Sequence, residues 1–224
     1  MGRLYLLRHA ESKANDANRD EYTLFGGGET DSPLSPAGRK QAEALRGELG
    51  AIHFDRILSS PLLKARETLE ITLPKASPEI FDALVERRLG KLSGLTREEI
   101  IQRFPELEGE LTRDPKLRKF RESFIEAPLQ YQIESYTVVA ARLRRWVREV
   151  LEKQPRNSST LIVSHKHILR CLLYLLLSDQ KTHQKAATEL EIPNATPIFL
   201  VKNLDQWVYV RGLSKEPFSS PGVA

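Results

Sequence analysis

Reactive side chains follow three segments of the chain that the sequence predicts to be buried strands. They are Arg8 and His9 after residues 3–7, Ser59 and Ser60 after residues 54–58, and Ser164 and His165 after residues 160–163. In an open α/β sheet, ligands bind beyond the carboxyl ends of the strands. If the first and last of these strands are neighbours, the two histidines converge in one crevice.

Two more residues indicate what that crevice could bind. Arg66 lies on the first turns of a predicted helix over residues 62–73, and its planar guanidinium could reach back and hold a pair of phosphate oxygens. Helix N-termini would reinforce such anion binding. Glu86 follows a short predicted strand at residues 79–81, and a carboxyl beside a bound dianion keeps its proton and can serve as a general acid. An ion pair with Arg87 or Arg88 is the alternative interpretation of Glu86.

Strands alternate with helices along the chain, which predicts a three-layer α/β/α fold with a mostly parallel central sheet. The predicted helices are 37–49, with Ser35 as N-cap and Pro36 at the first position, then 62–73, 135–153 and 168–177. Residues 197–201 and 207–210 predict a final hairpin. The charged, proline-interrupted stretch from 96 to 132 predicts a helical insertion at about residues 90–135. Residues 1–213 are therefore expected to form a single domain, followed by a flexible tail at 214–224.

Composition excludes several classes of protein. The 224 residues include 34 Lys and Arg against 30 Asp and Glu, an excess too slight to indicate a nucleic-acid partner. Basic clusters such as Arg142, Arg144, Arg145 and Arg148 are predicted to be solvated helix faces. One cysteine, Cys171, excludes an internal disulfide and is predicted to be an inert core thiol. The longest apolar stretch, 172–177, is far below the roughly 20 residues of a membrane span, so we expect a soluble, cytoplasmic protein with no membrane partner.

Five segments carry motifs that occur together in a known order. They are Leu6-Leu7-Arg8-His9-Ala10-Glu11-Ser12 with Asn15, Asp31 to Gly38 with Gln41-Ala42, Ser59 to Thr68, Glu86 with Gly90 and Gly94, and Ser164-His165 with the later Pro193-Asn194-Ala195. In this order they resemble the histidine phosphatase superfamily, also called the phosphoglycerate mutase-like family. The resemblance covers most of residues 3–211 and is weakest over 96–132.

This resemblance implies a phosphoglycerate mutase-like fold and a defined mechanism. His9 would attack phosphorus through a neutral imidazole nitrogen and form a phosphohistidine. The groups that would stabilise the transferred phosphoryl group are Arg8, Arg66 and His165, with Asn15 as an additional neutral donor. Glu86 would protonate the departing alkoxide and then take a proton from the hydrolytic water. Arginine and histidine would supply the positive charge, so the resemblance implies no metal and no cofactor.

The chain departs from the family pattern at two places: the first should leave the fold unchanged, and the second concerns the substrate. Ala10 stands where the family usually has glycine, and Lys166 and His167 follow His165 where it usually has small residues. If Lys166 lines the pocket, the substrate carries negative charge besides the reacting phosphate. Lys166 is therefore predicted to bind substrate.

The function favoured by the sequence is hydrolysis of phosphate monoesters, and the predicted partner is a small anionic phosphorylated molecule. A phosphoglycerate mutase is the alternative, because the segment Leu84 to Gly90 resembles mutases. Against it, no arginine and tyrosine cluster for a glycerate carboxylate is evident. A third hypothesis, a non-catalytic phospho-ligand binding module, would require a damaged catalytic set. The sequence leaves the oligomeric state open, with a dimer as one option.

Overall fold

Six strands form one mixed sheet in a computed structural model of the chain, which describes residues 2–15, 28–113, 129–155, 157–177, 190–203 and 206–211. The strands are β1 (Gly2–Arg8), β2 (Arg56–Ser59), β3 (Glu79–Ile80), β4 (Ser159–Ser164), β5 (Pro197–Asn203) and β6 (Gln206–Arg211), in the order β3-β2-β4-β1-β5-β6. The first four run parallel, whereas β5 is antiparallel to β1 and pairs with β6 as a hairpin. The predicted mostly parallel sheet and final hairpin are confirmed.

The register of the three inner parallel strands aligns their carboxyl ends. Arg8 of β1 lies opposite Ser164 of β4, and Ser59 of β2 lies opposite Val163 of β4. Pairing continues past the end of β1, where the His9 N–H donates to the Ser164 carbonyl at 2.9 Å. The reactive residues that follow these strands therefore begin at one edge of the sheet.

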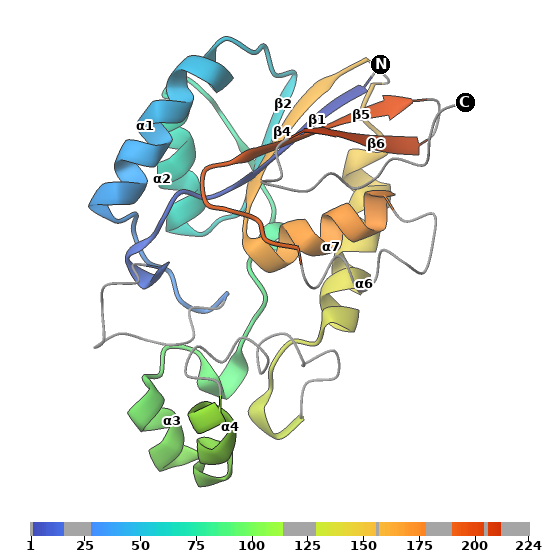
Figure 1. The fold of residues 1–224 in the computed structure, drawn as a ribbon. Coiled ribbons are helices and arrows are strands. Elements are labelled where there is room, and N and C mark those ends of the chain that lie inside the picture. Colours follow the sequence, from blue (N-terminus) through green and yellow to red (C-terminus); the bar gives the residue numbers. More distant parts are fainter. Residues whose placement is uncertain are drawn as a thin grey trace.

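Helices cover both faces of the sheet, which confirms the three-layer fold (Figure 1). They are α1 (Pro36–Gly50) and α2 (Leu63–Thr72) on one face, and α6 (Tyr136–Trp146) and α7 (Lys166–Leu177) on the other. Because side chains alternate along a strand, Leu4 and Leu6 of β1 pack towards α6 and α7, whereas Tyr5 and Leu7 pack towards α1 and α2. The four apolar side chains of β1 are thus divided between two hydrophobic clusters.

Local signals account for the helix starts, with one correction in α6. The Ser35 side chain accepts the Gly38 N–H and Pro36 occupies the first turn of α1, as predicted. Helix α6 begins after its N-cap Ser135 and continues into a π-helical turn at Val147–Leu151. The apolar residues of the predicted helix 135–153 place Val138 on its apolar face, but in the structure Val138 is 54% exposed. The buried stripe follows a spacing of three or four residues from Tyr136, and position 138 falls outside it.

Residues 89–133 contain a second helical region with its own hydrophobic core. Helices α3 (Arg97–Arg103) and α4 (Glu108–Arg113) stand apart from the sheet in Figure 1. Their cluster consists of Leu89, Leu92, Leu95, Ile100, Leu107, Leu111, Tyr131 and Ile133. The chain enters and leaves this region side by side, because the Glu134 N–H donates to the Arg88 carbonyl at 3.0 Å. We call the described residues of this region, 89–113 and 129–133, the cap.

Some predictions concern residues outside those described. The predicted tail at 214–224 lies there. Within the described ranges, no helix has the length and apolar character needed to cross a bilayer. The cytoplasmic location predicted from the sequence stays a prediction.

Candidate active site

The two histidines meet at the carboxyl ends of adjacent parallel strands. His9 follows β1 and His165 follows β4, and their ring centroids are 5.1 Å apart. Both are buried, with His9 3% exposed and His165 fully covered. The convergence that the sequence predicted only if β1 and β4 were neighbours therefore occurs.

Hydrogen bonding and charge prepare His9 to react through one ring nitrogen. Its Nδ1 lies 2.7 Å from the carbonyl of Ala10, and because a carbonyl only accepts, we assign the proton to Nδ1 and a free lone pair to Nε2. Burial, reinforced by the positive charges of Lys64 and Arg8, holds the pKa of His9 well below its usual 6.5. His9 is therefore neutral at neutral pH, and the lone pair of Nε2 is available to react.

His165 is held as the opposite tautomer. Its Nε2 lies 2.7 Å from the Ser60 hydroxyl, whose oxygen also accepts the Leu62 N–H at 3.3 Å. We assign the hydroxyl proton to this hydrogen bond, so that Nδ1 carries the ring N–H. Within the described residues, Nδ1 of His165 and Nε of Arg8 are buried without a hydrogen-bond partner. Two buried donors beside a neutral imidazole suit the oxygens of an anion.

Backbone contacts fix Arg8 and His9 from two sides. On one side, the Thr68 hydroxyl of α2 accepts the Ala10 N–H at 2.9 Å. On the other, Asn194 Nδ2 donates to the His9 carbonyl at 2.8 Å, and the Arg8 Nη1 donates to the Ile192 carbonyl at 2.7 Å. The segment at 193–195 that the sequence analysis singled out thus positions the end of β1.

Lys64, rather than Arg66, is the cation that α2 directs into this cluster. Lys64 is 3% exposed, and its positive charge lowers the pKa of both His9 and His165. Its Nζ donates to the Thr30 carbonyl at 3.3 Å, and burial lowers the pKa of Lys64. The placement predicted for Arg66 is wrong. Arg66 is exposed and lines a separate hollow of about 290 Å³ with residues such as Leu69.

Lys64 rather than Arg66 faces the cluster because of their positions around the helix. Residues two apart on an α-helix point in nearly opposite directions, so Lys64 and Arg66 cannot share a face. Lys64 lies one turn before Thr68, which is already bonded to the Ala10 backbone. A helical projection of residues 62–73, with the apolar Ala65 and Leu69 turned inward, would have identified Lys64 from the sequence.

Glu86 belongs to the same buried group. It is 8% exposed, and one carboxylate oxygen accepts the Arg87 N–H at 2.9 Å. Burial raises the pKa of Glu86, although that N–H and the charges of Lys64 and Arg8 act in the opposite direction. The Arg87 side chain instead donates to the Glu134 carbonyl at 2.7 Å and lies 4.7 Å over the Tyr136 ring.

Two residues that the sequence analysis did not assign to the site position Glu86. Arg142 was predicted to be solvated, but its guanidinium donates to the carbonyls of Ala83 at 2.6 Å and Val85 at 2.9 Å. Gly28 donates its N–H to the Arg87 carbonyl at 2.9 Å. A Cβ on Gly28 would lie 2.2 Å from the Glu86 carbonyl, so only glycine permits this approach.

The remaining sequence candidates have defined contacts. Asn15 is exposed, and its side-chain oxygen accepts the Ser12 hydroxyl at 2.9 Å, which closes a local turn. Lys166 pairs with Glu191 at 3.0 Å, and His167 Nδ1 hydrogen-bonds the Tyr136 hydroxyl. Substrate binding by Asn15 or Lys166 stays a prediction.

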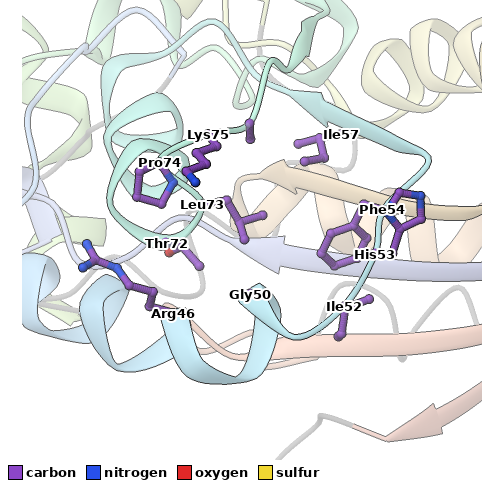
Figure 2. Close-up of a pocket in the computed structure, with 11 residues that line it drawn as sticks. Arg46, Gly50, Ile52, His53, Phe54, Ile57, Thr72, Leu73, Pro74 and Lys75 are labelled. Carbon is purple, nitrogen blue, oxygen red and sulfur yellow. The ribbon is translucent and has the colours of Figure 1, made fainter.

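Cys171 and the described hollows lie apart from this chemistry. Cys171 is buried in the core, as predicted, and burial raises the pKa of its thiol to about 12. A hollow of about 470 Å³ lies at the opposite end of the sheet. Figure 2 shows its lining residues, which come from the ends of α1 and α2 and the segment before β2. Arg46, His53 and Lys75 line it together with Phe54. In the described part of the chain, no group of three or more His, Cys, Asp or Glu side chains could hold a metal ion.

Comparison with known proteins agrees with this geometry. Residues 4–212 match the family model of the histidine phosphatase superfamily (branch 1). Phosphoserine phosphatase 1 of Hydrogenobacter thermophilus is 33% identical over 179 residues, which cover 79% of this chain and 77% of that protein. A 2,3-bisphosphoglycerate-dependent phosphoglycerate mutase of Buchnera aphidicola is 29% identical and covers 93% of this chain and 98% of its own.

The chain is also similar to one more curated protein and to a solved structure. The chain is 33% identical to the 6-phosphofructo-2-kinase/fructose-2,6-bisphosphatase of Caenorhabditis elegans over 76% of its residues, but spans only 33% of that protein. Among solved structures, a mycobacterial glucosyl-3-phosphoglycerate phosphatase with bound VO3 superimposes with a TM-score of 0.71 at 27% identity. The superposition covers 93% of this chain and 96% of that one.

Proposed function

Because the chain belongs to the histidine phosphatase superfamily (branch 1), we propose that it hydrolyses phosphate monoesters of small molecules through a phosphohistidine at His9. The observation that carries this proposal is the state of His9. Its Nδ1 is bonded to the Ala10 carbonyl, and its depressed pKa leaves Nε2 unprotonated. A neutral imidazole in a buried cluster of cations is suited to attack a phosphate dianion.

In the first step, His9 Nε2 forms a bond to phosphorus while the ester P–O bond breaks. The leaving alkoxide takes the carboxyl proton of Glu86. Because its pKa is raised, Glu86 stays protonated to higher pH than an ordinary carboxyl. In the second step, water attacks phosphorus and the P–N bond breaks. Glu86, now a carboxylate, accepts the proton of that water, and inorganic phosphate leaves with the enzyme restored.

Stabilisation of the phosphoryl oxygens falls to three groups around His9. These are the Arg8 guanidinium, the His165 Nδ1–H and the Lys64 ammonium. Lys64 takes the role that the sequence analysis gave to Arg66, because Lys64 is the buried cation. Such preorganised donors act where charge develops in the transition state, which is the dominant catalytic contribution in phosphoryl transfer.

The direct test is turnover of p-nitrophenyl phosphate between mildly acidic and neutral pH with a chelator present, combined with trapping of the enzyme during turnover. We expect hydrolysis to survive the chelator. Quenching in base should preserve a phosphoenzyme that acid destroys, because a phosphorus–nitrogen bond is acid-labile. Binding of phosphate esters without any turnover would instead support the non-catalytic module, and turnover without a trapped phosphoenzyme would contradict the covalent route.

The mutase alternative is kept because a phosphoglycerate mutase relative covers nearly the whole chain. A mutase must protect its phosphoenzyme from water, whereas a phosphatase must expose it. The lifetime of the phosphoenzyme in buffer, measured by adding base at increasing times after the substrate is exhausted, therefore separates the two. Rapid release of inorganic phosphate supports the phosphatase, and a long-lived species that passes its phosphoryl group to an added phosphoglycerate supports the mutase.

Replacing Glu86 with glutamine should slow hydrolysis in proportion to the basicity of the leaving group. Alkyl phosphates need the proton, so their kcat should fall by about 10²- to 10⁴-fold, whereas p-nitrophenyl phosphate should lose much less. Because the pKa of Glu86 is raised, the first step loses its acid as the pH rises through that pKa. The alkaline limb of the wild-type profile for alkyl phosphates should therefore vanish in the variant. Equal losses for both leaving groups would contradict the assignment of Glu86.

A further inference from the structure

A second group of charges lies beside the catalytic pocket. Lys166, the first residue of α7, directly follows His165, and its Nζ lies 3.0 and 3.1 Å from the two carboxylate oxygens of Glu191. Arg170 is one helical turn further along α7, so it faces the same side as Lys166, and its Nη2 is 3.7 Å from Glu191. Ile192, the residue after Glu191, accepts a hydrogen bond from Arg8 Nη1 at 2.7 Å, so this group adjoins the residues that carry the two histidines.

The members of this group differ sharply in burial. The side chain of Arg170 is 1% exposed and that of Lys166 is 24% exposed, whereas that of Glu191 is 71% exposed. The two cations are therefore held in place by the protein around them. The carboxylate can turn away into water at little cost, because ion pairs with an exposed partner contribute little to stability.

The backbone on either side of Glu191 is fixed. Arg170 Nε donates to the Leu190 carbonyl at 2.5 Å, and Arg8 Nη1 donates to the Ile192 carbonyl at 2.7 Å. The Glu191 side chain can consequently move while the segment that carries it stays attached to the site. The Glu191 carboxylate thus occupies the position beside Lys166 and Arg170 in which the carboxylate of a bound ligand could lie.

We propose that Lys166, supported by Arg170, binds a second anionic group of the substrate, and that the Glu191 carboxylate occupies this subsite until substrate displaces it. The inference rests on the proposed phosphatase function and names its substrate class. These substrates are phosphate monoesters whose leaving group carries a further negative charge, of which a carboxylate is the simplest case. Lys166 and Glu191 then set specificity in opposite directions.

The test compares two esters that differ in one charged group. Glycerol 3-phosphate and 3-phosphoglycerate share the reacting ester, but only the second carries a carboxylate. We expect Lys166→Met to raise KM for 3-phosphoglycerate, relative to glycerol 3-phosphate, by about tenfold or more, as loss of a charge-assisted hydrogen bond requires. Glu191→Gln should lower that same ratio, because it removes the competing carboxylate. Lys75→Met, an exposed lysine at the opposite end of the sheet, is the matched control.

Opposite effects of the two variants on one substrate distinguish this subsite from a structural ion pair. A structural pair would make both variants change both esters alike, and that result would overturn the proposal. Glu191 lies on the surface, so Glu191→Gln gives an answer even if Lys166→Met does not fold. If the wild type hydrolyses no phosphate ester, the proposed function fails. Calorimetric titration of the same two esters into each variant then still decides whether the subsite exists.

Discussion

Replacing His9 with alanine is expected to lower kcat/KM for p-nitrophenyl phosphate by at least about 10⁴-fold, because the step that forms the phosphoenzyme loses its nucleophile. No other described side chain offers a buried, neutral imidazole nitrogen with its second nitrogen bonded to a backbone carbonyl. The phosphoenzyme trapped from the wild type should be absent from the variant. Turnover and base-stable phosphate incorporation are the two measurements.

His53→Ala provides the matched control for this prediction. The His53 side chain is 90% exposed and lines the hollow at the opposite end of the sheet (Figure 2). Its removal should leave kcat/KM within about twofold, as for other exposed residues away from a site. If His9→Ala kept several per cent of wild-type activity, the nucleophile would have to be another group.

The second large effect is expected from a pair of substitutions on α2. Lys64→Met should lower kcat/KM by about 10²- to 10³-fold, the usual loss when one preorganised donor to a transition-state oxyanion is removed. Arg66→Met should change it by less than about twofold, because Arg66 is exposed and faces away from the site. Lys64→Arg should restore part of the activity by keeping the positive charge. Loss of activity in Arg66→Met with retention in Lys64→Met would reverse the assignment.

The pH profile separates an electrostatic role of Lys64 from a purely structural one. Lys64 lowers the pKa of His9, so its removal should raise that pKa. Protonated His9 cannot attack, and the acid limb of the profile should therefore move to higher pH in Lys64→Met. Misfolding would reduce activity at every pH without moving the limb.

Much of the fold could be predicted because its determinants are local. The apolar runs of β1 and β4, the Ser35-Pro36 start of α1 and the final hairpin all depend on short stretches of sequence. The rule that ligands bind beyond the carboxyl ends of the strands then predicted that His9 and His165 belong to one site. Their adjacency followed only from the β1–β4 pairing, which joins residues more than 150 positions apart and leaves no local signal.

The predictions for the site were wrong or missing where a residue's role depends on the direction of its side chain or on contacts with residues distant in sequence. Arg66 was chosen by residue type, whereas helical phase selects Lys64. Arg142 was predicted to be solvated because its helix is charged, yet its partners are carbonyls about 60 residues earlier in the chain. Glu191 gave no signal at all, since its importance depends on Lys166 and Arg170 being folded against it.

The hydrogen bond between the backbones of Arg88 and Glu134 has a consequence for how the sequence of the cap can change. Entry and exit of the cap lie together, and its hydrophobic cluster shares no residue with the clusters that hold the sheet. Insertions of this kind can be lengthened, shortened or exchanged at two adjacent points without rebuilding the scaffold. Substitutions inside the hydrophobic cluster of the cap should therefore leave the two clusters of the sheet intact. Substitutions at the base of the cap should reach the site, because Ser93 hydrogen-bonds Thr30, whose carbonyl accepts from Lys64.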